Sequence, residues 1–429
     1  MSIAQHRRTV WFPTAGQRPA ATPLGPDIAA DVAIIGAGFT GLTAALHLAR
    51  RGAKVVILEA DAVGAGASGV NAGFVVPNFA KADPDAVIAR LGRERGTRLL
   101  NMIGIGADRV FATIRDNAIA CDAEQNGWIH VAHSPAMLDV LARRAAAWRA
   151  LGRPVAMLDE AQARARTGLR HCVGALIDES GGMLHPLNYA YGLAAAAIAA
   201  GATLHENAPV DRIARVGSVW QLASGGTTLR ADKVLLCTNA FTHGAARPLG
   251  RSTVPLVVYQ IATRPLDAAN VRRISPQRNP VADTRANLLT YRLDRDNRLI
   301  SGGMSMLPIG AESRMAGMIA ARLRHELSLP ETPMVDFVWR GTAAMTMDFL
   351  PHLHEFGPGF LGGIGCNGRG IALTAMLGEV LANAISGADP RDLPIGMTKP
   401  GGVPMRMLAA AAPSFAIAQA RWQDHRAGL

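Results

Sequence analysis

The chain has 429 residues, 49% of them hydrophobic, and a formal net charge of +11. This length exceeds one ordinary hydrophobic core, so we expect two domains in a globular α/β enzyme. The cations are spread along the chain and aromatic residues make up only 5%, which argues against a nucleic-acid partner. Four isolated cysteines predict a reducing compartment, the cytoplasm, and the absence of a long uninterrupted apolar run predicts no membrane span.

The segment 31–59 carries the first functional signal. It predicts two buried strands, residues 32–35 and 54–58, on either side of a helix at residues 42–51. The turn after the first strand has the spacing G-x-G-x-x-G, formed by Gly36, Gly38 and Gly41. Such glycines allow a tight turn, close approach to a pyrophosphate and close helix packing, while Glu59 can accept hydrogen bonds from ribose hydroxyls. We therefore predict a Rossmann-like dinucleotide site.

A second glycine-rich loop, residues 64–73, follows directly and reads G-A-G-A-S-G-V-N-A-G. Small residues let the backbone approach a flat or anionic ligand, and Ser68 and Asn71 add polar contacts. The loop lies at the carboxyl end of the second strand, where open α/β sheets bind their ligands. This long second contact surface favours a flavin dinucleotide over a nicotinamide one.

The next region predicts helices over residues 84–150 and 160–167, with a strand near residues 127–131. A glycine turn then leads into a helix at residues 187–200, which Gly201 ends. Further strands are expected at residues 202–205, 210–213, 219–223, 227–230 and 234–237.

The pair Gly225-Gly226 predicts a hairpin between the third and fourth of these strands. The last strand ends at Thr238 and Asn239, where the chain is expected to meet the cofactor again. Residues 250–345 then change character, because alternating β-branched and aromatic residues predict an antiparallel sheet that covers the cofactor. Five side chains on its strands are candidates to face a substrate: Tyr259, Tyr291, Arg292, Trp339 and Arg340.

A third glycine-rich segment lies near the end of the chain. Residues 360–364 predict a strand, followed by G-C-N-G-R-G at residues 365–370 and a helix at residues 371–385. The N-terminus of that helix offers partial positive charge to a negative group, such as the N1/C2 edge of a reduced flavin. Residues 397–429 are expected to form an arm with one helix.

Together these segments resemble the FAD-dependent amine and amino-acid oxidases of the D-amino-acid oxidase superfamily, and most of all γ-glutamylputrescine oxidase-like proteins. The resemblance covers about residues 30–390 and rests on the three glycine-rich segments and on further matches at Gly182 to Pro186, Thr238 to Ala240, Arg298, Gly302, Gly303, Trp339, Thr346, Asp348 and Pro351. It implies bound FAD and an α/β fold, in which a Rossmann-like, glutathione-reductase-type FAD domain adjoins a mainly antiparallel β substrate domain carrying helices. It also implies oxidation of a C–N bond by hydride transfer to flavin N5, after which the imine hydrolyses.

The resemblance implies a role for each matched position. The residues expected to contact FAD are Gly36, Gly38, Phe39, Thr40, Gly41, Glu59, Ala60, Gly66, Ala67, Ser68, Asn71, Ala72, Gly73, Phe74, Val210, Thr238, Asn239, Gly365, Gly368, Arg369, Gly370 and Ile371. The residues expected to orient the substrate are Tyr291, Arg292, Arg340 and Arg369. The FAD domain is expected to combine residues 31–80, 181–250 and 346–396, and the substrate domain residues 81–180 and 251–345, between arms at 1–30 and 397–429.

The sequence also departs from its relatives. Residues 340–342 lack the cysteine that tethers flavin in sarcosine oxidase-like members, and none of the four lysines falls in the predicted antiparallel sheet. Ala343 stands where glycine oxidase-like members carry a carboxylate-binding arginine, and Val70 stands where many relatives have arginine. Two alternatives therefore stay open: an FAD-dependent dehydrogenase of an amino or hydroxy acid with a quinone or carrier acceptor, and a non-catalytic flavin-binding partner subunit. We predict no metal site, because the close histidine pairs lack further ligands: His130 with His133, and His352 with His354.

Overall fold

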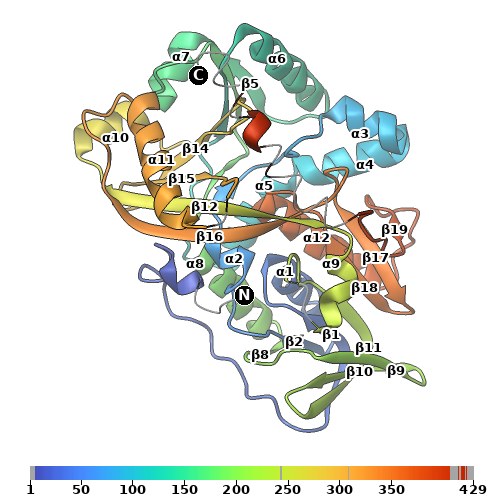
Figure 1. The fold of residues 1–429 in the computed structure, drawn as a ribbon. Coiled ribbons are helices and arrows are strands. Elements are labelled where there is room, and N and C mark those ends of the chain that lie inside the picture. The colour runs from blue at the N-terminus through green and yellow to red at the C-terminus, as the bar shows by residue number, and fades with distance from the viewer. Residues whose placement is uncertain are drawn as a thin grey trace.

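The computed structural model describes residues 5–241, 244–307, 309–405, 414, 417–420 and 422. Two large β-sheets dominate it, and helices lie against both (Figure 1). The long strands β12 (Val254–Pro265) and β16 (Val335–Met345) cross the middle of the molecule in that view. The other sheet lies below them, with strands β1, β2, β8 and β11.

The lower, nine-stranded sheet contains the predicted dinucleotide unit. Its centre is a run of parallel strands in the order β18-β11-β1-β2-β8. Their bounds are Phe360–Ile364, Thr227–Leu236, Ile28–Ile35, Val55–Leu58 and Thr203–His205. The sheet is completed by β17 (His352–Gly357), β19 (Met397–Thr398), β9 (Arg212–Val216) and β10 (Val219–Ser224).

Side chains of the central strands alternate between two buried faces. Ile34 and Ile57 pack with the residues of three helices, α1 (Phe39–Ala49), α8 (Pro186–Ala199) and α12 (Gly370–Ile385). Ile35 and Leu58 point the other way, toward a cluster that includes the β10 hairpin and the short helix α9 (Arg247–Gly250). Burial on both faces explains why these strands read as continuous apolar runs.

The predicted strand–helix–strand order is confirmed, with two differences. β1 begins at Ile28, inside the segment predicted as an irregular arm, because residues 28–30 pair with residues 229–231 of β11. The strands predicted at residues 227–230 and 234–237 form the single strand β11, whose outer edge pairs first with β10 and then with β18. The predicted hairpin is confirmed, and both of its glycines have positive φ, 54° and 83°.

The eight-stranded sheet has the order β16-β12-β15-β14-β13-β4-β6-β5. Its further bounds are β15 Arg298–Gly303, β14 Thr290–Leu293, β13 Val281–Asp283, β4 Trp128–Ala132, β6 Gly174–Asp178 and β5 Val155–Leu158. All neighbouring strands are antiparallel except β13 and β4, which are parallel. The predicted antiparallel sheet is therefore confirmed, and it also takes strands from residues 128–178.

One face of this sheet packs with helices α7 (Glu160–Thr167) and α11 (Ala311–Glu326), and its core includes Ile129 and Leu299. The other face joins the main core of the protein through Trp128, Ile300 and Trp339.

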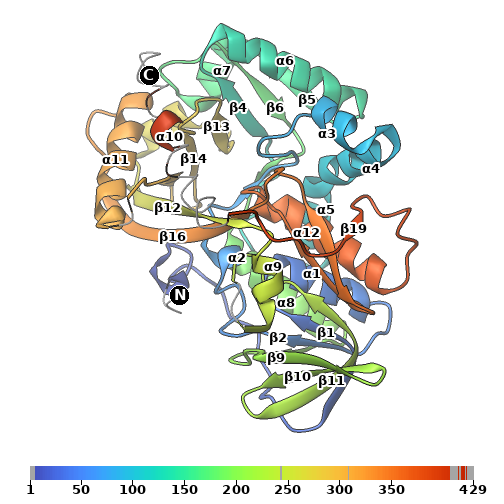
Figure 2. The same ribbon diagram turned by 45° about the vertical axis from the view of Figure 1, so that its right-hand side comes forward.

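Further helices are α3 Pro84–Leu91, α4 Arg93–Gly104, α5 Gly106–Asp116, α6 Pro135–Ala150 and α10 Ala268–Ile274. Figure 2 shows α3, α4 and α6 beside the end of the sheet formed by β4, β6 and β5. Within the described ranges, no helix is both long and apolar enough to cross a membrane.

The N-terminal segment docks on the body through a short 3₁₀ turn, η1 (His6–Arg8), and the residues after it. Trp11 is 2% exposed, and its indole N–H donates to the carbonyl oxygen of Asn71 at 2.9 Å. The Trp11 ring meets His185 edge-on, with centroids 5.0 Å apart. The next residue, Phe12, is 42% exposed and so contributes less to this docking. Trp11 thus fixes the N-terminal segment against the second glycine-rich loop.

Candidate active site

The first glycine turn depends on contacts that only glycine permits. A Cβ added to Gly41 would lie 2.0 Å from the Gly36 carbonyl oxygen, and one added to Gly36 would lie 2.8 Å from the Cys237 carbonyl oxygen. Gly36 also has a φ of +105°, which side chains disfavour. Side chains here would separate α1 from β1 and from the end of β11. The next residues, Phe39 and Thr40, are buried in the first turn of α1.

Glu59 lies at the end of β2 and reaches back to this turn. Its Oε2 accepts a hydrogen bond from the Ala37 N–H at 2.7 Å, and its Oε1 accepts one from the Asp61 N–H at 3.0 Å. Burial raises the pKa of Glu59 above its ordinary value, although both hydrogen bonds favour the ionised form. Each carboxylate oxygen has a further lone pair, so Glu59 can still accept from ribose hydroxyls. Ala60 follows it and is exposed.

The second glycine-rich loop contains the short helix α2 (Ala67–Val70) and meets the start of α1. Ser68 Oγ accepts a hydrogen bond from the Phe39 N–H at 3.0 Å, so it occupies the N-terminus of α1. A Cβ on Gly38 would lie 2.9 Å from the same oxygen, and one on Gly66 would lie 2.8 Å from the Phe241 ring. The first two glycine-rich segments therefore form one continuous surface.

Asn71 holds the shape of this second loop. Its side-chain amide donates to the carbonyl oxygens of Ala67 and Ser68 at 3.2 and 2.8 Å, and its Oδ1 accepts from the Gly73 N–H at 2.8 Å. The side chain of Asn71 is thus engaged within the loop. Phe74 begins β3 (Phe74–Val75), which pairs with β7 (Gly182–Met183).

The third glycine-rich segment is held by an asparagine that the sequence did not single out. Asn367 has a φ of +49°; its Oδ1 accepts from the Thr346 N–H at 2.8 Å and its amide donates to the Gly365 carbonyl oxygen at 2.8 Å. This ties the turn before α12 to the end of β16. Gly368 and Gly370 have no atom within 4 Å of an added Cβ, so both border open space. Ile371, in the first turn of α12, is buried.

These segments converge at one edge of the parallel sheet. β1 ends at Ile35, β11 at Leu236 and β18 at Ile364. The first glycine-rich turn follows β1 directly, the turn with Thr238 and Asn239 follows β11, and the third glycine-rich segment follows β18. Helices α1 and α12 pack so closely that a Cβ on Gly378 would lie 2.6 Å from the Thr40 carbonyl oxygen. This edge is where open α/β sheets bind ligands.

The residues at this edge fit FAD. They offer an acidic acceptor at Glu59, a surface of small residues, and a buried Thr238 Oγ1 that has no hydrogen-bond partner in the described structure. Asn239 beside it has a φ of +49°, a strained backbone of the kind found at ligand sites. Val210 is half-buried next to the same sheet.

Tyr291 does not face the site, which corrects the expectation from the sequence. Its side chain is fully buried in the core cluster shared with α7 and α11, and its hydroxyl donates to the Thr167 carbonyl oxygen at 2.5 Å. Burial raises the pKa of this phenol well above its ordinary value. Strand alternation directs Tyr291 toward the helices and its neighbour Arg292 to the opposite face.

Arg292 joins the eight-stranded sheet to the second glycine-rich loop. Its Nε donates to the Ala72 carbonyl oxygen at 2.6 Å, and its Nη2 donates to the Leu184 carbonyl oxygen at 3.0 Å. The guanidinium carbon lies 5.0 Å from the centroid of the Trp11 ring. Burial lowers the pKa of Arg292 to about 10, so it stays charged at neutral pH. These contacts position the loop, and they leave Arg292 facing backbone rather than an open site.

Arg340 and Arg369 lie at different parts of the structure. Arg340 is on the edge strand β16, and its buried Nε has no hydrogen-bond partner among the described residues. Its neighbour Trp339 points to the other face, where the indole donates to the Val70 carbonyl oxygen at 2.8 Å. Arg369 lies instead over Trp128 of β4, the sixth strand of the sheet order. Five strand spacings separate β16 from β4 by roughly 24 Å along the sheet.

The structure reveals a cluster around Trp128 that sequence reasoning missed. The guanidinium of Arg369 lies 5.1 Å from the Trp128 ring centroid, and the rings of Trp128 and His130 are 5.0 Å apart. Arg144 of α6 contacts His130 Nδ1 at 3.2 Å and Asp83 at 2.5 Å. These residues come from four separate segments, so no local pattern links them. The only signal was His130 in an otherwise apolar strand, which we considered as half of a histidine pair.

An open cavity of about 490 Å³ lies between α3 and the turn after β16. Lys81, Arg90 and Asp348 line it together with small and aliphatic side chains, and Arg90 pairs with Asp348 at 3.2 Å. Among the described residues, no group of three or more His, Cys, Asp or Glu side chains is arranged to hold a metal ion.

Glycine-rich turns meet at the carboxyl edge of a parallel sheet, and a mainly antiparallel sheet lies over them. This two-layered arrangement is typical of oxidoreductases that bind a flavin dinucleotide. Comparison with known proteins gives the family. Residues 31–384 match the DAO family model, described as FAD dependent oxidoreductase, so the chain belongs to this family and is an FAD-dependent oxidoreductase.

Individual relatives agree with this assignment. The chain is 31% identical to a probable oxidoreductase OrdL of Haemophilus influenzae and 28% identical to the γ-glutamylputrescine oxidoreductase of Escherichia coli, over 90% of each chain in both cases. The crystal structure of glycine oxidase from Geobacillus kaustophilus matches the fold with a TM-score of 0.68 and 24% identity, covering 84% of this chain and 96% of that one. The predicted fold class, cofactor and family are thereby confirmed.

Proposed function

We propose that the protein oxidises the C–N bond of a small amine or amino acid, and that the imine product hydrolyses to a carbonyl compound and an amine or ammonia. The observation that carries this proposal is the convergence of three glycine-rich segments at one sheet edge, beneath a second sheet whose Trp128 the Arg369 guanidinium meets. When bound, FAD supplies the redox chemistry by accepting a hydride equivalent from the carbon next to nitrogen. The task of the chain is to hold and align the reactants.

Each group of residues has a proposed part in this alignment. Glu59 would accept from the adenosine ribose, and the backbone at Gly36–Gly41 and 66–73 would lie along the pyrophosphate. The turn at residues 365–370 and the start of α12 would face the polar edge of the flavin ring. Arg369 would face the substrate and Arg292 would act by positioning the second loop, whereas Arg340, on the face of the sheet that Tyr259 and Tyr291 share, would have no part in orienting the substrate.

We also propose that the two sheets mark two domains with the boundaries stated above, except that β1 and β19 extend the FAD domain to residues 28 and 398, and that the protein works in the cytoplasm. The strands of the nine-stranded sheet come from residues 28–58, 203–236, 352–364 and 397–398, and those of the other sheet from 128–178, 254–303 and 335–345. All four cysteines are free and buried, which suits a reducing compartment.

The experiment that tests the activity is an anaerobic screen of amines and of D- and L-amino acids against the purified yellow protein. Bleaching of the flavin absorbance by at least one amine is expected. If hydroxy acids bleach the flavin while no amine does, C–N oxidation is wrong.

A second candidate function keeps the fold and changes the electron acceptor to a quinone or a carrier protein. One observation favours it: the four lysines, Lys54, Lys81, Lys233 and Lys399, all lie outside the eight-stranded sheet, whereas related oxidases use a lysine near the flavin to promote reaction with oxygen. Peroxide released stoichiometrically during turnover in air would identify an oxidase. Turnover that requires an added quinone or dye would identify a dehydrogenase.

A further inference from the structure

The cluster around Trp128 carries an excess of positive charge on half-buried side chains. It contains two guanidinium groups, Arg144 and Arg369, and its one ion pair among the described residues is Arg144 with Asp83. His130 adds no further positive charge, because burial and then the two arginines lower its pKa well below the ordinary value and keep the imidazole neutral. Two guanidinium groups beside one carboxylate leave a net positive charge, which an anionic ligand would balance through charge-assisted hydrogen bonds.

Arg369 is the group without a partner. Its Nε is buried and has no hydrogen-bond partner, and its side chain forms no ion pair with any described residue. Its one specific contact is the face of the Trp128 ring, 5.1 Å from the guanidinium carbon. A cation–π contact holds a guanidinium in place without using its N–H donors, so the four N–H groups of the two terminal nitrogens remain available to a ligand.

Arg144 is held in a complementary way. Its Nε donates to Asp83 Oδ1 at 2.5 Å and its Nη1 contacts His130 Nδ1 at 3.2 Å. The other ring nitrogen, His130 Nε2, lies 3.1 Å from the Asp283 carbonyl oxygen. A carbonyl oxygen only accepts, so His130 carries its proton on Nε2 and accepts at Nδ1 from Arg144. The guanidinium is thus fixed at two of its five donors.

The missing anion belongs with the substrate rather than with the cofactor. The backbone at residues 368–371 and the N-terminus of α12 lie at the carboxyl edge of the parallel sheet, where the FAD segments converge. The Arg369 side chain leaves that edge and crosses to β4 of the other sheet. Its charge is therefore directed toward the layer opposite the cofactor segments.

We propose that a carboxylate of the substrate binds between Arg144 and Arg369, so that the protein selects amines that carry a carboxylate over neutral amines and polyamines. Trp128 and His130 act as positioning residues that hold the two guanidinium groups. This inference rests on the proposed function for the identity of the ligand as an amine substrate. It assigns the anion site to Arg144 and Arg369 rather than to position 343, where glycine oxidase-like members carry their carboxylate-binding arginine and this chain has alanine.

The test uses simple carboxylates that contain no amine and cannot be oxidised, such as acetate and propionate. Their dissociation constants are measured with the FAD-loaded enzyme by the change they cause in the flavin absorbance spectrum. Arg369→Gln and Arg144→Gln should each weaken binding at least tenfold, as expected for the loss of a charge-assisted hydrogen bond. Arg369→Lys keeps the charge and should retain more binding than Arg369→Gln.

Arg143→Gln is the matched control, because Arg143 neighbours Arg144 on α6 and is exposed. It should bind carboxylates as the wild type does, and all variants should retain one FAD per chain. The inference is wrong if the wild type binds no carboxylate, if both glutamine variants bind within twofold of the wild type, or if Arg369→Gln loses FAD instead.

A failure of the proposed function gives a different result. If carboxylates bind in an arginine-dependent way while no amine reduces the flavin, the anion site stands and amine oxidation is wrong. If amines reduce the flavin with no preference for those that carry a carboxylate, and both arginine variants keep the wild-type kcat/KM, amine oxidation stands and the anion site is wrong.

Discussion

Gly41 shows how far the cofactor site depends on one absent side chain. A Cβ at this position would lie 2.0 Å from a backbone carbonyl oxygen, that of Gly36, and backbone cannot move aside at low cost. We expect Gly41→Ala to lower the FAD content of the purified protein at least tenfold, measured by absorbance after extraction.

Gly317 provides the control for this change. It lies inside α11, and a Cβ there would meet nothing within 4 Å. Because alanine favours helix over glycine, Gly317→Ala should raise the free energy of unfolding by about 1 kcal/mol and leave FAD content unchanged. Equal FAD content in the two variants would show that the first turn does not hold the cofactor as described.

Asp178 predicts a specific pH dependence of stability. Burial raises its pKa to about 6, although the N–H and hydroxyl of Ser180 donate to its Oδ1 at 3.1 and 2.6 Å. Between about pH 4 and pH 6 the folded chain therefore holds a proton that the unfolded chain has released. The stability that the folded chain gains by holding this proton is full below about pH 4 and is lost as the pH rises to about 6.

Asp178→Asn removes this titration. The free energy of unfolding of Asp178→Asn minus that of the wild type should rise by about 2–3 kcal/mol as the pH is raised from about 4 to about 7. Urea unfolding at each pH measures this difference. Asp139→Asn, on the exposed surface of α6, serves as the control and should follow the wild-type profile. A constant difference between Asp178→Asn and the wild type at every pH would contradict the account.

At the scale of elements, the N-terminal segment acts as a brace for the second glycine-rich loop. Trp11 is 2% exposed, donates to the Asn71 carbonyl oxygen and packs against Arg292 and Trp339. Trp11→Ala should lower the free energy of unfolding by about 3–5 kcal/mol and speed FAD release, because it leaves a cavity beneath the loop. Thermal unfolding and the rate of flavin loss on dilution measure both effects.

Phe12→Ala is the natural comparison for that variant. Phe12 is 42% exposed, so its removal should change stability by about 0.5 kcal/mol or less. If Trp11→Ala released FAD no faster than Phe12→Ala, the brace would have no part in cofactor binding.

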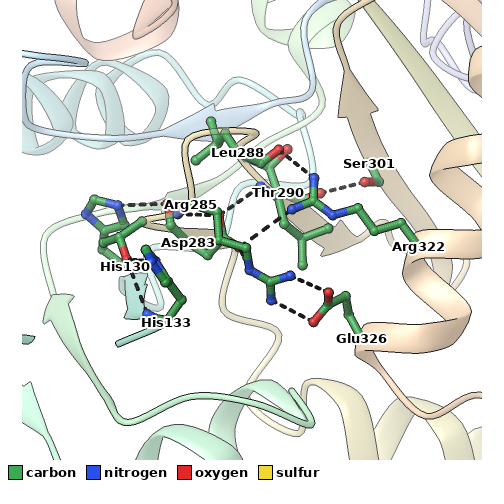
Figure 3. A network of polar contacts seen from close by, with 11 residues as sticks. His130, His133, Asp283, Arg285, Leu288, Thr290, Ser301, Arg322 and Glu326 are labelled. Atoms are coloured by element: carbon green, nitrogen blue, oxygen red, sulfur yellow. Dashed lines mark hydrogen bonds and ion pairs between the residues drawn. The ribbon is translucent and has the colours of Figure 1, made fainter. Parts of the chain in front are cut away.

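A buried ionic network fixes the loop between β13 and β14 (Figure 3). Arg285 is placed between Asp283 and Glu326, and both of its terminal nitrogens donate to Glu326 of α11. Arg285 Nε lies 2.8 Å from Asp283 Oδ2. His130 joins the same network through the Asp283 carbonyl oxygen, so α11 is linked to the strand that carries the Trp128 cluster.

Removing one carboxylate from this network leaves buried positive charge unbalanced. Glu326→Gln should lower the free energy of unfolding by about 3–5 kcal/mol, measured by urea unfolding. Glu160→Gln removes one side of the exposed pair with Arg164 and should cost about 0.5 kcal/mol. Similar losses in both variants would mean that the buried network contributes no more than a surface ion pair.

The same elements show what the sequence can and cannot predict. The apolar runs of β1 and β2, the Gly225-Gly226 hairpin and the helices α1 and α12 follow from local periodicity and glycine placement. The three-residue strand β13 and its parallel pairing with β4 were not predicted, because so short a strand has no measurable period. The placement of Tyr291 was wrong for a related reason: a strand pattern shows that two faces alternate but not which of them meets the site.

The Trp128 cluster was not predicted because its parts are distant in sequence. Trp128 and Arg369 meet across two sheets, and Arg144 joins them from α6, a helix that was predicted from its sequence pattern without any indication of this contact. Glycine-rich loops could be found from sequence because the backbone itself binds the ligand there. A side-chain cluster assembled by tertiary packing leaves no such local pattern.

At the scale of the whole molecule, the two sheets divide the work. In our proposal the parallel sheet holds the FAD on which the family depends, and its glycines leave little freedom for change. The antiparallel layer supplies long side chains from several strands and helices, so it is the part in which substrate preference can vary. This division explains why the cofactor could be predicted from the sequence, whereas the substrate could be argued only from the structure.

The central claim is that this second layer presents an amine to the bound FAD, and one measurement tests it most directly. The FAD-loaded enzyme is reduced anaerobically with a limiting amount of an amine that bleaches it, and the products are quantified. The account predicts one carbonyl compound and one ammonia or amine formed for each FAD reduced. Bleaching that yields a carbonyl compound without release of nitrogen would contradict it.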